Sequence, residues 1–81
     1  MQVGDVVVEQ ILSGDLAEPV DYDQDHDEWV VLLRGTAELD VDGETMTLAP
    51  GDWVLIPRRK PHRLLETSRG ASWLAVHLPV R

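Results

Sequence analysis

Polar side chains that can bind a metal ion or transfer a proton gather at two places in the 81-residue sequence. Tyr22, Gln24, His26 and Glu28 are spaced two residues apart, so an unbroken β-strand would direct all four to one face of a sheet. His62 follows a basic turn that begins and ends in proline, and it opens another apolar run. One imidazole, one carboxylate and one or two further donors can hold a divalent ion. Because acids and histidines at turn edges are usually solvated, spacing alone leaves a solvated segment as the alternative.

Short β-type runs separated by turn residues surround these positions along the whole chain. No apolar period of 3.6 residues persists for three turns, so we expect no long helix. The predicted strands are residues 6–12, 20–24, 29–33, 37–41, 44–48, 53–56, 62–66 and 72–78. About eight short strands at regular spacing are typical of a β-sandwich, barrel or jelly roll, whose interior can hold a ligand between apolar walls.

The dipeptide Asp42-Gly43 predicts a tight hairpin between two of these strands. Residues 37–41 and 44–48 both alternate between apolar and polar side chains on either side of it. A two-residue type I′ turn needs positive φ at both central positions, which the pair Asp-Gly accommodates.

Length and composition restrict the classes of protein. Residues 1–81 are predicted to form one domain with a thin core. With no cysteine, the chain has neither disulfides nor thiolate metal ligands. A net charge of −8 argues against a nucleic-acid partner. No apolar run reaches the roughly 18 residues of a membrane span, and the first residues lack the order of a signal peptide. We therefore expect a cytoplasmic protein without a membrane partner.

Charge is distributed unevenly along the chain. Residues 15–28 contain seven acids and no base, whereas residues 58–69 contain five bases and one acid. The simpler interpretation is a pair of solvated loops that attract each other across the fold. The alternative is that the basic segment orients an anionic ligand.

The middle of the chain resembles the two motifs of the cupin superfamily, in particular its small single-domain members of the "cupin 2" type. Glu28, six residues and Gly35 match the second half of the first motif, which in the family is His-x-His, Glu, six residues and Gly. Gly51, five residues, Pro57 and the nearby His62 match the second motif. The resemblance covers about half of the chain. It implies an all-β jelly-roll barrel of about eight short antiparallel strands.

The metal-binding positions of the family are only partly kept. The resemblance places the two family histidines at Tyr22 and Gln24, and it implies a ligand set of Gln24, Glu28 and His62 for a divalent Zn, Fe, Mn or Ni ion. A neutral amide oxygen and a protonated phenol are poorer ligands than imidazole. Three outcomes stay open: a weak site of Gln, Glu and His, a local bulge that brings in His26 as the alternative ligand, or no metal.

Three functions are compatible with this pattern. The first is a metal-dependent enzyme acting on a small polar or anionic metabolite, with Tyr22, His26 or Glu28 moving a proton. The second is a non-catalytic module that binds or senses a small molecule or metal. The third is a structural barrel with a vestigial pocket. Fold alone does not choose between them. His77, at the end of the last predicted strand, is interpreted as a structural histidine with no assigned role.

Apolar side chains exceed what one thin core should hide, which predicts a homodimer. Residues 29–33 are apolar throughout, as in a strand buried on both faces, and all three tryptophans fall in predicted strands. Residues 6–12 and 72–78, near the chain ends, are expected at sheet edges, where unpaired backbone groups invite a second copy.

Overall fold

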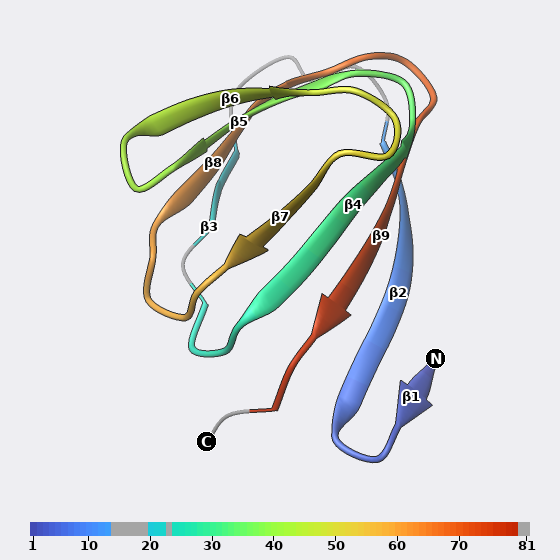
Figure 1. The fold of residues 1–81 in the computed structure, drawn as a ribbon, viewed down its shortest axis with the longest axis vertical. Helices are drawn as coiled ribbons and strands as arrows, with labels where there is room; N and C mark the ends of the chain where they lie inside the picture. Colours follow the sequence, from blue (N-terminus) through green and yellow to red (C-terminus); the bar gives the residue numbers. More distant parts are fainter. Residues whose placement is uncertain (14–19, 23, 80–81) are drawn as a thin grey trace.

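The computed structural model describes residues 1–13, 20–22 and 24–79, which form an all-β fold (Figure 1). All eight predicted strands are present, and a two-residue strand precedes them. The strands are β1 (Gln2–Val3), β2 (Val6–Ser13), β3 (Val20–Tyr22), β4 (Glu28–Arg34), β5 (Ala37–Val41), β6 (Glu44–Leu48), β7 (Trp53–Ile56), β8 (His62–Thr67) and β9 (Ala71–His77). Among these residues no helix is long and apolar enough to cross a membrane.

Two antiparallel sheets enclose the core. One has the strand order β1-β2-β9-β4-β7 and the other β3-β8-β5-β6. In Figure 1 the sheet of β3, β5, β6 and β8 folds over the sheet that carries β4, β7 and β9. Both sheets contribute to one apolar cluster, which includes Val30, Leu32 and Trp73 from the first sheet and Leu39 and Leu48 from the second.

The prediction that residues 6–12 and 72–78 both lie at sheet edges is wrong. Strand β2 lies between β1 and β9, although β1 pairs only with Val6 and Val7. Strand β9 lies between β2 and β4, and its pairing with β2 extends over seven residue pairs from Val7–His77 to Ser13–Ala71. The edges of this sheet are β1 and β7. The position of a segment at the end of the chain does not determine its place in a sheet, because antiparallel pairing joins strands that are distant in sequence.

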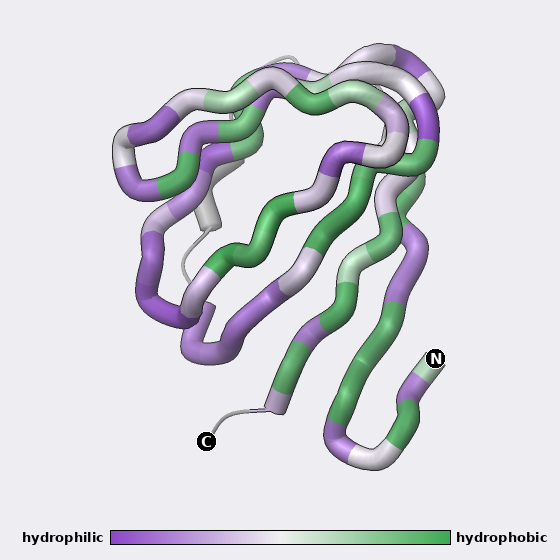
Figure 2. The backbone as a smooth tube through the Cα atoms, in the orientation of Figure 1, coloured by the Kyte–Doolittle hydropathy of each residue, from purple (hydrophilic) through white to green (hydrophobic). Residues whose placement is uncertain are grey.

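Strand β4 is buried on one face only. Glu28, Val30 and Leu32 point into the fold, whereas Trp29 and Val31 are only half-buried and Leu33 is exposed. The uninterrupted apolar sequence of this strand predicted burial on both faces. The difference arises because the described chain leaves the outer face of the five-stranded sheet accessible to solvent, with Trp53 62% and Leu55 51% exposed. Figure 2 shows the hydrophobic stretches of β4 and β7 that contribute to this face.

The hairpin prediction is confirmed. Asp42 and Gly43 have φ values of 52° and 86°, and the strands on either side pair from Val41–Glu44 outward. The backbone nitrogen of Gly43 donates a hydrogen bond of 2.9 Å to Oδ1 of Asp40. Both turn positions therefore lie in the left-handed region that a type I′ turn requires.

Replacement of Gly43 by valine is expected to destabilise the protein by about 1 kcal/mol or more. A β-branched residue is strained at positive φ, although no atom lies within 4 Å of the position that a Cβ would occupy. Urea denaturation of the wild-type and variant proteins would measure the difference. An unchanged free energy of unfolding would contradict the turn assignment.

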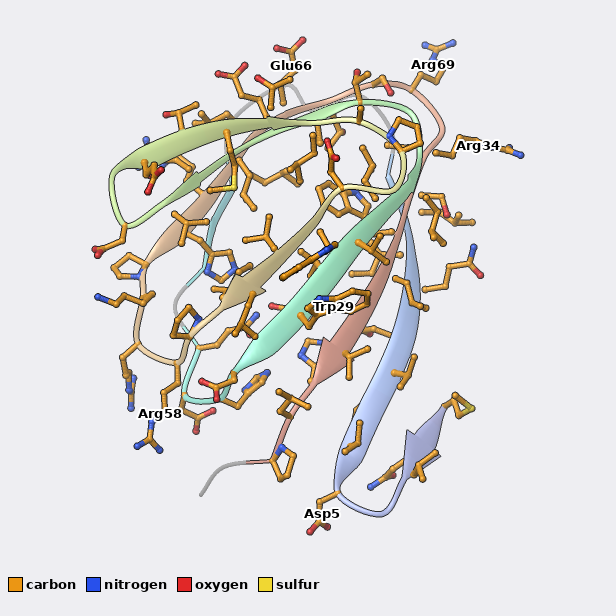
Figure 3. The ribbon with its side chains drawn as sticks, viewed as in Figure 1. Asp5, Trp29, Arg34, Arg58, Glu66 and Arg69 are labelled. Carbon is orange, nitrogen blue, oxygen red and sulfur yellow. The ribbon has the colours of Figure 1, made fainter. Side chains whose placement is uncertain are left out.

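The acidic and basic segments meet at one end of the fold, where the loops β3–β4 and β7–β8 lie in contact. The backbone nitrogen of Arg59 donates to the carbonyl oxygen of Gln24 at 2.8 Å, and that of Arg58 donates to Oδ1 of Asp27 at 2.8 Å. Figure 3 shows the Arg58 side chain pointing away from the barrel. These contacts hold together the two segments that carry Gln24 and His62.

Candidate functional site

A cavity of about 170 Å³ lies between the two sheets. Among the described residues, its polar side chains are Glu9, Gln24, Glu28, His62 and His77. The rest of the lining is apolar: Ile11, Val30, Leu39, Ile56, Leu64 and Trp73. Small volume, apolar walls and a few polar groups are typical of a site for a small ligand.

Glu28 and His62 reach the cavity from opposite sheets. Glu28 begins β4 and pairs with Ile56 of β7 and His77 of β9. His62 begins β8 and pairs with Tyr22 of β3 in the other sheet. Both side chains are buried, at 6% and 7% exposure. A buried carboxylate and a buried imidazole in one cavity can hold a cation or a polar ligand, because burial without such a partner is costly.

Gln24 supplies the third donor that sequence analysis placed here. Its loop is fixed by the hydrogen bond between its carbonyl oxygen and the backbone nitrogen of Arg59. Its side-chain Oε1 is buried and has no hydrogen-bond partner within the described chain. A buried acceptor left without a partner costs about 1–3 kcal/mol. A bound cation or hydrogen-bond donor would remove that cost.

The imidazole of His62 lies with Nδ1 at 3.4 Å from the carbonyl oxygen of Lys60. For Nδ1 to donate to this carbonyl, it must carry the ring proton, and Nε2 then holds the electron pair. Metal-binding histidines commonly donate their second ring N–H to a carbonyl oxygen in this way.

The cavity offers three ligands for a divalent ion only if the side-chain amide of Gln24 is counted with Glu28 and His62. Within residues 1–13, 20–22 and 24–79 no group of three or more His, Asp or Glu side chains is placed to hold a metal. Gln24, Glu28 and His62 together offer two oxygen donors and one nitrogen donor. That mixture suits Mn²⁺ or Fe²⁺ better than an ion that prefers sulfur.

His26 does not line this cavity. The strand predicted for residues 20–24 ends at Tyr22 and the next begins at Glu28, so the alternation of side chains is broken between them. His26 instead lies with Nε2 at 2.9 Å from Nδ1 of His77 and with Nδ1 at 3.2 Å from Oδ1 of Asp25. The hydrogen bond from His26 holds the pKa of the Asp25 carboxyl below its ordinary value.

Tyr22 is placed by its backbone alone, paired with His62 on β8. Its side chain lies outside the described part of the structure, so its assignment as a catalytic candidate stays a prediction.

Glu9 and His77 are cavity residues that sequence analysis did not assign to the site. His77 Nε2 lies 2.6 Å from Oε1 of Glu9 and 4.0 Å from Oε2 of Glu28. With His26 on its other nitrogen, His77 has both ring nitrogens in hydrogen bonds, as expected of a structural histidine, and it also lines the cavity. The sequence feature that could have indicated Glu9 is the alternation of side chains along β2. It places Glu9 on the same inward face as Val7 and Ile11.

A sequence profile of the family described as "Cupin domain" matches residues 7–77. An uncharacterized protein of Aquifex aeolicus (strain VF5) is 36% identical over 58 residues, which are 72% of this chain and 48% of that protein. The chain thus spans about half the length of this curated relative.

Solved structures of several small barrels superpose on the chain. One, from Ralstonia eutropha JMP134, is provisionally named a mannose-6-phosphate isomerase. It is 32% identical with a TM-score of 0.87, and the match covers 95% of this chain and 77% of that one. KdgF from Halomonas sp. is 20% identical with a TM-score of 0.88, over 100% and 74% of the two chains. An RmlC-like cupin from Shewanella frigidimarina NCIMB 400 is 21% identical with a TM-score of 0.83, over 95% and 68%. The last two support the fold alone.

Proposed function

The chain belongs to the cupin domain family, and on this basis we propose that its barrel binds one divalent metal ion together with a small polar ligand. Gln24, Glu28 and His62 would hold the ion. The observation that carries the proposal is the unpartnered, buried Oε1 of Gln24 in the same cavity as the buried Glu28 and His62. When bound, the ion would act as a Lewis acid on an oxygen atom of the ligand.

The cavity volume of about 170 Å³ favours a small ligand. Apolar walls would hold the carbon skeleton, while the polar side chains would orient its oxygen atoms.

Catalysis by proton transfer is favoured over simple binding by one further contact. Glu9, His77 and His26 form a hydrogen-bonded chain with distances of 2.6 and 2.9 Å, and Glu9 and His77 line the cavity. Such a chain can hold a proton at His77 Nε2 beside the ligand and exchange it with a more exposed imidazole. A binding or sensing module, the second candidate, would use the same cavity without turnover.

Metal titration tests the proposal. Protein treated with chelator and then desalted would be titrated by calorimetry with MnCl₂, and separately with salts of Zn²⁺, Ni²⁺ and, without oxygen, Fe²⁺. We expect one ion per chain for at least one of these metals. No heat of binding with any of the four would contradict the proposal and would favour a structural barrel.

A further inference from the structure

We infer that the cavity selects an uncharged or cationic ligand with hydroxyl or ammonium donors, and that the pair Glu9–His77 is its second recognition element. This inference rests on the proposed function, because it concerns the ligand of the same cavity. It narrows the ligand class from polar or anionic compounds to those that donate hydrogen bonds and carry no negative charge.

The first step is the charge of the lining. Among the described lining residues, Glu9 and Glu28 are carboxylates, and none is lysine or arginine. One divalent ion would only balance these two carboxylates, so a phosphate or carboxylate ligand would gain no net attraction. In a partly buried site, each uncompensated pair of like charges is strongly unfavourable.

The second step is the hydrogen-bonding capacity of Glu9. An ionised carboxylate only accepts hydrogen bonds, so it complements hydroxyl and ammonium groups. His77 Nε2 donates to Oε1 of Glu9 at 2.6 Å and so fixes the carboxylate at the cavity wall. The side chain of Glu9 is half exposed and that of His77 mostly buried, which places this pair where the cavity opens.

The basic segment 58–69 does not supply the missing positive charge. None of its arginines or lysines lines the cavity. Lys60 forms an ion pair of 3.2 Å with Asp42, and Arg58 points away from the barrel (Figure 3). The structure therefore favours contact between the loops over recognition of an anion by this segment.

Three molecules of similar shape and different charge test this inference: glycerol, serinol (2-amino-1,3-propanediol) and glycerol 3-phosphate. Calorimetric titration of protein loaded with the divalent ion that it binds most tightly would measure binding of each. We expect serinol to bind best, glycerol next, and glycerol 3-phosphate at least about tenfold more weakly than glycerol. Equal or tighter binding of the phosphate would overturn the inference, as would binding of none of the three.

Glu9→Gln keeps the shape and the acceptor oxygen but removes one negative charge. We expect it to reduce the preference for serinol over glycerol, whereas the exposed control Glu44→Gln on β6 should leave that preference unchanged. An unchanged preference in Glu9→Gln would remove Glu9 from the recognition element. Binding of a divalent ion with no selection of the ligand by charge would overturn this inference alone, whereas failure to bind any of the four ions overturns the proposed function.

Discussion

Replacement of either Glu28 or His62 by alanine is expected to abolish divalent-metal binding, whereas His26→Ala should weaken it little. Glu28 and His62 line the cavity from opposite sheets, and His26 lies outside it against His77. Loss of the anionic oxygen or of the imidazole leaves two donors, which is too few to displace water from a divalent ion. The affinity should fall more than about 100-fold, the upper range for loss of a supporting hydrogen bond.

Calorimetric titration of each variant would measure these affinities. Both residues are buried, so Glu28→Gln, which keeps the side-chain volume, accompanies Glu28→Ala, and circular dichroism checks that each variant is folded. Gln24→Ala should weaken binding less than either, because a neutral amide is the poorest of the three ligands. Loss of binding in the His26 variant alone would show that the ligand register is wrong.

Gly35→Ala is expected to destabilise the protein by about 3 kcal/mol or more. Gly35 has a φ of +85°, and a Cβ there would lie 2.5 Å from Oγ of Ser68 and 3.0 Å from Cα of Ala71. Ser68 accepts a hydrogen bond of 2.9 Å from the backbone nitrogen of Thr36, and Ala71 is fully buried. The neighbours therefore have little room to move, and strain at positive φ adds to the overpacking.

Gly43→Ala provides the matched comparison for this prediction. Gly43 also has positive φ, but no atom lies within 4 Å of its would-be Cβ, so only backbone strain of about 1 kcal/mol is expected. Urea denaturation would compare the two variants. Equal losses of stability would show that the close approach of Gly35 to Ala71 does not constrain the fold.

The strands could be predicted from the sequence because their signals are local. Residues 37–41 and 44–48 alternate regularly around Asp42-Gly43, and the structure reproduces both strands with the predicted bounds. The order of strands in the sheets could not be predicted in this way. The central place of β9 depends on its pairing with β2, which joins the two ends of the chain.

The candidate site was predictable in part for the same reason. The motif spacing places Gln24, Glu28 and His62, and the structure brings these three to one cavity. Glu9 and His77 are 68 residues apart and meet only through the pairing of β2 with β9, so no local pattern relates them. His26 shares the spacing of Gln24 and Glu28, but the break between β3 and β4 turns it toward His77.

Paramagnetic relaxation by Mn²⁺ tests the proposed metal site most directly. Substoichiometric Mn²⁺ would be added to ¹⁵N-labelled protein, and the broadening of side-chain signals would be recorded by NMR. The proposed site predicts that the imidazole of His62 and the side-chain amide of Gln24 broaden first, before the rings of His26 and His77. Broadening centred on His26 and His77, or spread over the exposed acids alone, would contradict an ion held by Gln24, Glu28 and His62.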